Sequence, residues 1–169
     1  MKIELKKFQF FERMSEETNA FASDIHVEGK KVGFAKNDGH GGKTYIHCYD
    51  GGNALMNKAE AYCKSLPPIV LDGISGKPFE IKMNLINFVD ELVQKELENK
   101  EAKKMEKQME KSIMWGVPKG FRYQQVKFKV PLSLIPLAQL QTYINKYKME
   151  FKKGEVFLNT NLERLGIKL

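Results

Sequence analysis

The stretch Val32–Tyr49, VGFAKNDGHGGKTYIHCY, decides how the first part of this chain folds. Two runs that alternate between apolar and polar side chains flank the loop Asn37–Gly42, NDGHGG. Such alternation is typical of strands that bury one face, and glycines between two strands favour a tight reversal of the chain. Because glycine tolerates the positive φ angles that turn successive amides to one side, the loop also suits a bound anion. A hairpin turn and a ligand contact are therefore the two interpretations of this loop.

Alternating runs upstream of the loop predict further strands. Residues 2–12 alternate with a change of phase at Lys6-Lys7, which indicates a bulge within a strand. Phe21–Glu28 alternates without interruption, and a glycine turn leads from it into the strand before the loop. Residues 1–50 are therefore predicted to form a four-stranded antiparallel meander.

Two amphipathic segments downstream predict helices. The first covers residues 53–66, where Asn53 is the expected N-cap and Pro67-Pro68 end the helical spacing. The second covers residues 84–115. Its charged half, residues 98–113, keeps only a thin apolar stripe, which indicates a helix that projects from the core or lies against a partner chain.

Residues 121–169 predict a strand followed by a helix and a short tail. Phe121–Val130 alternates with Val130 on its inward side, and Leu137–Phe151 carries apolar residues at helical spacing. With the meander, these elements predict an α+β fold in which helices pack on the sheet. A length of 169 residues is most simply one domain, so residues 1–169 are expected to form a single domain.

The net charge of +7 is concentrated in one part of the chain. Residues 119–153 contain eight lysine or arginine residues and one glutamate, so an anionic partner is expected to meet this segment. Only three basic residues of the chain are arginine, whereas base-edge recognition favours the planar arginine fork. The segment therefore suits phosphate attraction without base specificity. Tyr123 and Tyr143 lie off its apolar stripes and are suited to stack on a base.

Several classes of function have no support in the sequence. No run approaches the ~18 apolar residues that a membrane span needs, and the charged N-terminus lacks the apolar region of a signal peptide. The two cysteines, Cys48 and Cys63, are too few for a disulfide framework and fit a reduced cytoplasmic protein. The spacing of His26, His40 and His47 matches no zinc motif, so no metal and no cofactor is expected.

The loop also departs from the fingerprint of a phosphate-binding loop. Gly42-Lys43-Thr44 supplies the end of a GxxxxGK[ST] motif, but Asn37 stands where the first glycine of that motif belongs. A strand rather than a helix follows the loop, so no helix N-terminus reinforces its amides. The loop alone is therefore a weak candidate for holding a phosphate.

A catalytic alternative uses His40 or His47 as a general base, with Asp38 or Asp24 as its orienting carboxylate. Such an arrangement suggests phosphodiesterase-like chemistry. The paired His-x-Thr/Ser motifs of two-histidine phosphoesterases are absent, and no serine or cysteine stands on a nucleophile elbow. A non-enzymatic function is therefore favoured over this alternative.

The N-terminal part carries SEET at Ser15–Thr18, EGKKVG at Glu28–Gly33 and NDGHGG at Asn37–Gly42, with Phe21 between the first two. In this combination the chain resembles small uncharacterised accessory proteins from bacteriophages and prophages, over residues 1–50. The resemblance implies a phage accessory protein that works in the bacterial host cytoplasm. Small phage proteins of this kind often counter host immunity, and some of them sequester nucleotide signals.

The first hypothesis is a non-enzymatic protein that binds an anionic small molecule, a nucleotide, and the resemblance implies a host immune signalling nucleotide. The glycine loop needs the basic segment, from this chain or a second copy, to close over it. The second hypothesis is an inhibitor that docks on a host immune protein through residues 98–113 or forms a homo-oligomer through residues 84–115. The expected ligand-binding residues are Asn37, Asp38, Gly39, His40, Gly41, Gly42, Lys43, Arg122, Tyr123, Lys127 and Tyr143.

Overall fold

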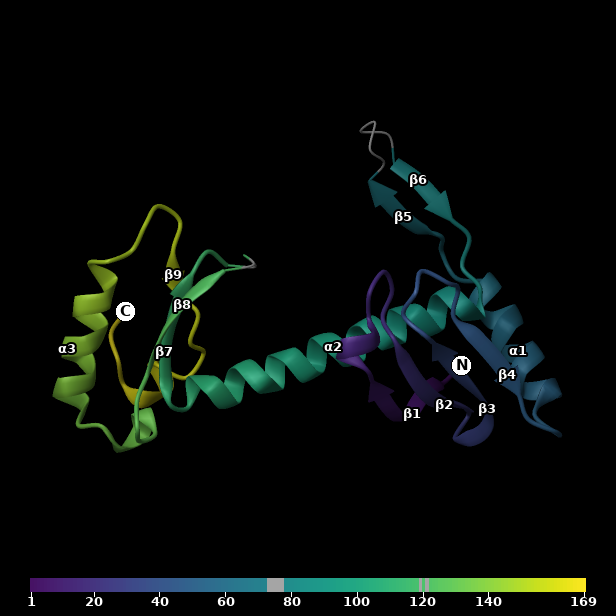
Figure 1. Ribbon diagram of the computed structural model, residues 1–169, viewed down its shortest axis with the longest axis horizontal. Coiled ribbons are helices and arrows are strands. Elements are labelled where there is room, and N and C mark those ends of the chain that lie inside the picture. Colours follow the sequence, from purple (N-terminus) through teal and green to yellow (C-terminus); the bar gives the residue numbers. More distant parts are fainter. Residues whose placement is uncertain (73–77, 119, 121) are drawn as a thin grey trace. The chain divides into compact units, whose positions relative to one another are not determined.

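The computed structural model of the chain describes residues 1–72, 78–118, 120 and 122–169. These residues fold into two compact units, Met1–Leu97 and Glu98–Leu169, and each unit has its own apolar core (Figure 1). The α+β class is confirmed, and the chain, which was predicted to be a single domain, divides into these two compact units. The boundary between the units falls within helix α2 (Leu85–Met109).

The first unit is built on a four-stranded antiparallel sheet in the order β1-β2-β3-β4. The predicted meander is thus confirmed. The predicted bulge in the first strand is also present, because the register shifts between Lys6 and Gln9, where Lys7 has a φ of 54°. A 3-10 helix, Glu12–Met14, links the first two strands. The strands are β1 (Ile3–Phe10), β2 (Phe21–Val27), β3 (Lys30–Asn37) and β4 (Tyr45–Cys48).

One face of this sheet forms the core of the first unit. Every second residue of β2 is buried, as its uninterrupted alternation predicts. Helix α1 (Asn53–Lys64) and the first half of α2 pack against the same face. Burial of each large aliphatic side chain stabilises the unit by ~1.5–3 kcal/mol relative to an exposed one. The buried side chains include Phe21, Ile25, Val27, Val32, Met56, Ala59, Cys63, Leu85, Val89 and Val93.

The two helices begin close to their predicted positions. Helix α1 ends at Lys64 rather than at residue 66, and Gly52 occupies the cap position that the sequence assigned to Asn53. Helix α2 begins after Asn84, whose side-chain oxygen accepts a hydrogen bond from the Asn87 amide at 2.9 Å. This bond satisfies an amide of the first turn, which has no partner within the helix.

The two cysteines are expected to differ in reactivity. Cys63 lies in the core, where burial and, to a smaller extent, Glu60 raise the pKa of its thiol to about 11. Cys48 is only partly buried. Because the thiolate is the reactive form, we expect a thiol reagent at about pH 8 to modify Cys48 rapidly and Cys63 only after denaturation. Cys48→Ser should remove the rapid phase, and two equally fast thiols in the folded wild-type protein would contradict this expectation.

A separate two-stranded sheet lies between α1 and α2 in the chain. It pairs β5 (Ile69–Asp72) with β6 (Pro78–Ile81), and this hairpin extends away from the β1–β4 sheet (Figure 1). Glycine and proline within residues 69–80 obscure this pair of strands in the sequence. The connecting residues 73–77 lie outside the described residues.

The helix predicted over residues 84–115 is too long. Helix α2 ends at Met109, and Ser112–Gly116 form strand β7, all of whose residues are buried. Such a strand is apolar on both faces, so its periodicity does not distinguish it from the end of a buried helix. Met109 belongs to the apolar stripe of residues 98–113 that was considered as a contact for a partner chain, but it is only 5% exposed. Within the described ranges, no helix combines the length and apolar character required to cross a membrane.

The second unit centres on β7, which pairs on either side with β8 (Tyr123–Lys127) and β9 (Val156–Phe157) in antiparallel fashion. Helix α3 (Leu137–Lys148) and two 3-10 helices, Leu132–Leu134 and Glu163–Leu165, complete it. The strand predicted to reach Val130 ends earlier, and Val130 is 46% exposed rather than inward, while Phe121 lies outside the described residues. The core contains Ile113, Trp115, Leu132, Leu140, Ile144, Leu162 and Ile167.

Candidate functional site

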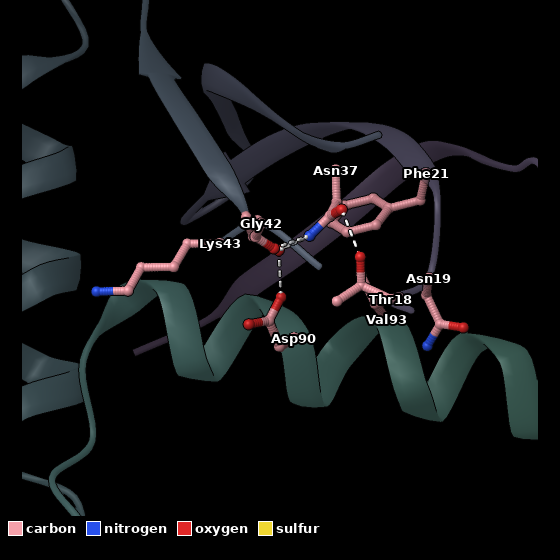
Figure 2. Close-up of a pocket in the computed structure, with 9 residues that line it drawn as sticks. Thr18, Asn19, Phe21, Asn37, Gly42, Lys43, Asp90 and Val93 are labelled. Atoms are coloured by element: carbon pink, nitrogen blue, oxygen red, sulfur yellow. Dashed lines mark hydrogen bonds between the residues drawn. The ribbon is translucent and has the colours of Figure 1, made fainter. Parts of the chain in front are cut away.

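Asn37 organises the glycine loop between β3 and β4. Its side-chain oxygen accepts a hydrogen bond from the Thr18 hydroxyl at 2.9 Å (Figure 2) and another from the Gly39 amide, also at 2.9 Å. Its side-chain nitrogen donates to the Gly42 carbonyl at 2.9 Å. Asparagine is favoured in turns because its side chain bonds the backbone two residues on. One side chain thus closes the loop and ties it to the segment before β2.

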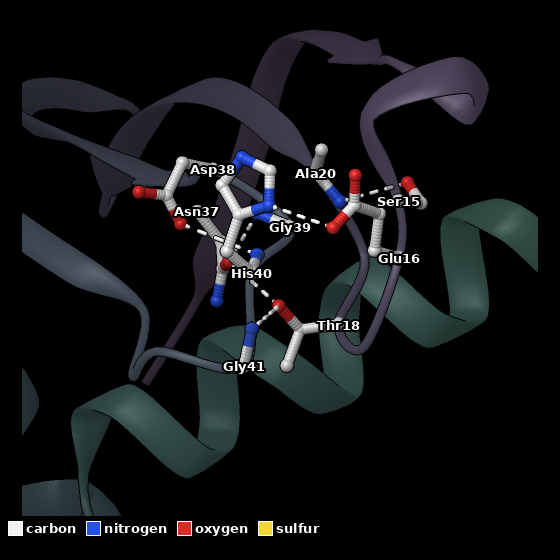
Figure 3. Close-up of polar contacts among 9 residues, drawn as sticks. All are labelled: Ser15, Glu16, Thr18, Ala20, Asn37, Asp38, Gly39, His40 and Gly41. Atoms are coloured by element: carbon white, nitrogen blue, oxygen red, sulfur yellow. Dashed lines mark hydrogen bonds and ion pairs between the residues drawn. The ribbon is translucent and has the colours of Figure 1, made fainter.

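Three amides of the loop already donate to side chains of the first unit. The Gly39 amide donates as described above, the His40 amide donates to Asp38 at 3.5 Å, and the Gly41 amide donates to Thr18 at 3.3 Å (Figure 3). An anion would have to replace these bonds, and each such bond contributes about 0.5–1.5 kcal/mol. Anion binding by these amides stays a prediction. The existing hydrogen bonds disfavour it.

The glycines of the loop meet a backbone requirement. Gly39 and Gly41 have φ angles of +93° and +83°, which favour glycine. The Gly39 carbonyl accepts hydrogen bonds from three successive amides, Glu16–Thr18, at 2.9–3.2 Å. A Cβ atom on Gly39 would also collide with the Met14 carbonyl. Backbone geometry therefore accounts for two of the glycines, which favours the turn interpretation.

The histidine of the loop, His40, already interacts with a carboxylate. His40 Nδ1 lies 3.1 Å from Glu16 Oε2, and both side chains are exposed (Figure 3). The catalytic alternative expected Asp38 or Asp24 as the orienting group, but the observed partner of His40 is Glu16, and Asp24 forms an ion pair with Lys31 at 2.9 Å. An anionic ligand at this loop would compete with Glu16 for His40.

A small pocket lies between the loop and α2. It has a volume of about 240 Å³ and is lined by Asn37, Lys43 and Asp90 among others (Figure 2). The Thr44 hydroxyl closes one side by donating to the Asp90 carboxylate at 2.5 Å. Ligand pockets commonly measure about 300–1,000 Å³. With its limited volume and a carboxylate in its wall, this pocket is poorly suited to a nucleotide.

Asp90 is expected to make the stability of the first unit depend on pH. The residue is exposed as a whole, but partial burial of its carboxyl raises the pKa above the ordinary value of 3.8, while the Thr44 hydroxyl lowers it. A raised pKa means that the folded state holds the proton more tightly than the unfolded state. The contribution of Asp90 to the free energy of unfolding is therefore complete below pH 3.8 and is lost as the pH rises through the raised pKa.

We expect Asp90→Asn to prevent this loss of stability at higher pH, because the amide carries no charge and still accepts a hydrogen bond from the Thr44 hydroxyl. The free energy of unfolding of the variant should rise relative to that of the wild-type protein as the pH increases above 3.8. Urea unfolding followed by circular dichroism at several pH values measures this difference. Glu91→Gln removes the same charge from the next, exposed position and is the control. A constant difference between Asp90→Asn and wild type across the pH range would contradict the expectation.

A cleft lined by lysines lies in the second unit. Lys104 and Lys107 come from the last turns of α2, Lys111 follows the helix, and Lys127 ends β8. The cleft has a volume of about 380 Å³, within the range of ligand pockets. Its lining contains one carboxylate, Glu110. In the part of the chain that the structure describes, none of the four lysines forms an ion pair with a carboxylate.

The floor of this lysine cleft is polar and ordered. Ser112 is 1% exposed, and its hydroxyl accepts a hydrogen bond from Gln125 Nε2 at 2.8 Å across β7 and β8. The side-chain oxygen of Gln108 is buried in the wall without a hydrogen-bond partner among the described residues. The cleft therefore combines positively charged side chains with the amide groups of Gln108 and Gln125.

The structure distributes the predicted ligand-binding residues over both units. The seven residues from Asn37 to Lys43 lie together in the first unit, and the other four lie in the second. Lys127 lines the lysine cleft, whereas Arg122 and Tyr123 are exposed at the opposite end of β8. Tyr143 packs against the core with its ring centroid 5.3 Å from that of Phe128, so its assignment as a residue off the apolar stripe was wrong.

Sequence reasoning missed three of the four cleft lysines. Lys104, Lys107 and Lys111 were treated as part of a Lys/Glu helix stabilised by charge pairs. Their i, i+3, i+7 spacing was a usable signal, since residues so spaced share one helix face. The contribution of Lys127 from β8 was not readable from that spacing, because it depends on the pairing of β8 with β7.

All three histidines of the chain lie in the first unit. Among the described residues, no group of three or more histidine, cysteine, aspartate or glutamate side chains is arranged to hold a metal ion. Comparison with known proteins finds no matching family model, no matching curated protein and no matching solved structure.

Proposed function

We propose that this chain is a non-enzymatic binding protein for a phosphate-bearing nucleotide, and that the lysine cleft of the second unit holds the phosphates. The observation that carries this proposal is the convergence of Lys104, Lys107, Lys111 and Lys127 on one cleft without ion-pair partners among the described residues. Unpaired lysines close together repel one another, and a phosphate group relieves that repulsion.

The surroundings of the cleft support binding rather than turnover. General acid–base catalysis requires a titratable group beside the reacting atoms, and histidine is the commonest one. The lining contains no histidine and only one carboxylate, Glu110. The second unit as a whole carries 15 basic and seven acidic side chains, which attracts anions from solution.

Both the sequence and the cleft support the proposed ligand class. The resemblance of residues 1–50 to phage proteins favours an immune signalling nucleotide of the bacterial host cytoplasm. The proposal no longer relies on the glycine loop, whose amides and histidine are bonded within the first unit.

Isothermal titration calorimetry against cyclic nucleotides, cyclic dinucleotides and ADP-ribose tests the proposal. We expect at least one member to bind with an affinity that falls as salt is added, because exposed charges are screened. The bound nucleotide should be recovered intact after long incubation. Uniform absence of binding would exclude the function for these ligands, and hydrolysed nucleotide would replace binding by catalysis.

A further inference from the structure

The β1–β4 sheet has a second face, opposite to the one that α1 and α2 cover. Side chains on this outer face alternate with the buried ones along each strand. Across β3 and β4 the register pairs Phe34 with His47 and Lys36 with Tyr45, so these four side chains share the outer face. Tyr49 follows two residues after His47 and continues the same row.

Four rings on this surface, Phe34, Tyr45, His47 and Tyr49, form a continuous cluster that we term the aromatic face. The Phe34 ring centroid lies 5.2 Å from that of His47, 6.1 Å from that of Tyr45 and 6.0 Å from that of Tyr49. The rings of Tyr45 and His47 are nearly parallel, with an interplanar angle of 16° and centroids 6.5 Å apart. Tyr49 is nearly perpendicular to His47, at 77° with centroids 6.0 Å apart, so Tyr45 and His47 are the pair whose near-parallel planes match those of consecutive unpaired bases.

The aromatic face is open to solvent among the described residues of its unit. Tyr45 is 52% exposed, His47 is also exposed, and Phe34 and Tyr49 are partly buried. Cross-strand aromatic pairs do stabilise a sheet, which accounts for the contact between Phe34 and His47. Sheet stability alone does not require the outermost rings to present their faces to water. Contiguous exposed aromatic surface of this kind marks interaction sites.

Two lysines stand at the ends of the ring row. Lys36 Nζ lies 5.7 Å from the Tyr45 ring centroid, and Lys31 Nζ lies 4.9 Å from that of Tyr49. The register places two carboxylates on this face, Asp24 and Glu4. Asp24 pairs with Lys31 at 2.9 Å and with Lys7 at 3.9 Å, and Glu4 pairs with Lys2 at 3.0 Å. Lys36 forms no ion pair with any described carboxylate. The cations therefore frame the rings while the acidic charge between the strands is neutralised.

We propose that the aromatic face binds single-stranded nucleic acid, with bases stacked on Tyr45 and His47 and a phosphate near Lys36. Aromatic rings interleaved with cations are the means by which proteins hold unpaired bases without reading their sequence. A duplex is excluded from such a surface because its bases are already stacked and paired. The inference concerns the first unit and does not rest on the lysine cleft.

Fluorescence anisotropy of the full chain with short fluorescein-labelled oligothymidylate and oligouridylate measures this binding, and the corresponding duplexes are the negative arms. We expect both single strands to bind and the duplexes to bind at least tenfold more weakly. The variant Tyr45→Thr/His47→Thr keeps strand-forming side chains but removes two rings. Its affinity should fall by about 5-fold to 150-fold for each base that loses its stacking partner. Circular dichroism confirms that the variant remains folded.

The matched control is Phe79→Thr, which removes an exposed ring, 50% accessible, from β6 of the same unit. It should leave the affinity unchanged. Photo-crosslinking of 4-thiouridine in the oligouridylate should map to the peptide that contains Tyr45–Tyr49. An unchanged affinity of the folded double variant, equal duplex binding, or crosslinks confined to the second unit would overturn the proposal.

Sedimentation velocity tests the remaining alternative, which is self-association through the aromatic face. If removing the rings changes the oligomeric state and leaves oligonucleotide affinity intact, the aromatic face joins copies of this chain, and the proposal is overturned. The variant Lys107→Gln/Lys111→Gln distinguishes the two binding sites. Loss of oligonucleotide binding in the ring variant, with binding retained in the lysine variant, supports the aromatic face irrespective of the cleft.

Discussion

Asn159→Ala should unfold the second unit more easily than any surface substitution in it. Asn159 is 7% exposed, and its side-chain oxygen accepts a hydrogen bond from the Met114 amide at 2.7 Å. Its side-chain nitrogen donates to the Ser112 carbonyl at 2.8 Å. The central strand β7 is thereby fixed at two backbone groups, which alanine would leave buried and unpaired. Each such group costs about 1–3 kcal/mol, so we expect the free energy of unfolding to fall by about 3 kcal/mol.

The position of the single tryptophan makes this measurement specific. Trp115 lies in the core of the second unit, stacked on Tyr147 with ring centroids 5.1 Å apart, so its fluorescence during urea unfolding reports on that unit. Asn145→Ala on the exposed side of α3 is the matched control and should cost less than ~0.5 kcal/mol. If both variants unfold at the same urea concentration, Asn159 does not hold β7 in place.

The meander was predictable because each of its strands buries one face only. Alternation assigns residues to faces directly: in β4 it separates Tyr45 and His47 from Ile46, which packs against the core. The glycine-containing turns limited the ways in which these strands can connect. What alternation did not reveal is which face the helices cover, so the exposed aromatic face emerged only from the three-dimensional structure.

The second unit was less predictable because its organising strand is short and buried on both sides. Residues 112–116 form β7 through pairing with β8, which follows after six residues, and with β9, whose partner residues lie 40 and 42 positions further along the chain. Local spacing within the sequence extended the helix through Ile113 instead. The role of Asn159 cannot be recognised from local spacing for the same reason, since the partners of its side-chain amide are 45 and 47 residues away.

The glycine loop shows a different limit of the sequence. Its composition correctly indicated a special backbone, and the positive φ angles of Gly39 and Gly41 bear this out. Composition does not indicate which groups accept hydrogen bonds from the amides. Here the Asn37 side chain accepts one from the Gly39 amide, and the Thr18 hydroxyl accepts one from the Gly41 amide. A residue pattern that suits an anion is therefore equally suited to a loop that satisfies its own hydrogen bonds.

The largest functional effect is expected from Lys107→Gln/Lys111→Gln, which removes two charges from the lysine cleft. Hydrogen bonds to charged groups contribute about 1.5–3 kcal/mol each, and solvent exposure reduces this. We expect the affinity for the nucleotide that binds the wild-type protein to fall by about tenfold or more, since 1.4 kcal/mol corresponds to tenfold. Calorimetry at fixed salt measures the change, and the weaker salt dependence of the variant provides a second readout.

Lys152→Gln/Lys153→Gln is the informative control because it makes the same change in net charge within residues 119–153. Both lysines are exposed and neither lines the cleft. If the second unit acted only through its overall charge, the two double variants would weaken binding equally. If the cleft positions the phosphates, the control should lose less than ~3-fold, because separated exposed charges are largely screened. Equal losses would therefore reject the lysine cleft as the site while retaining an electrostatic role for the second unit.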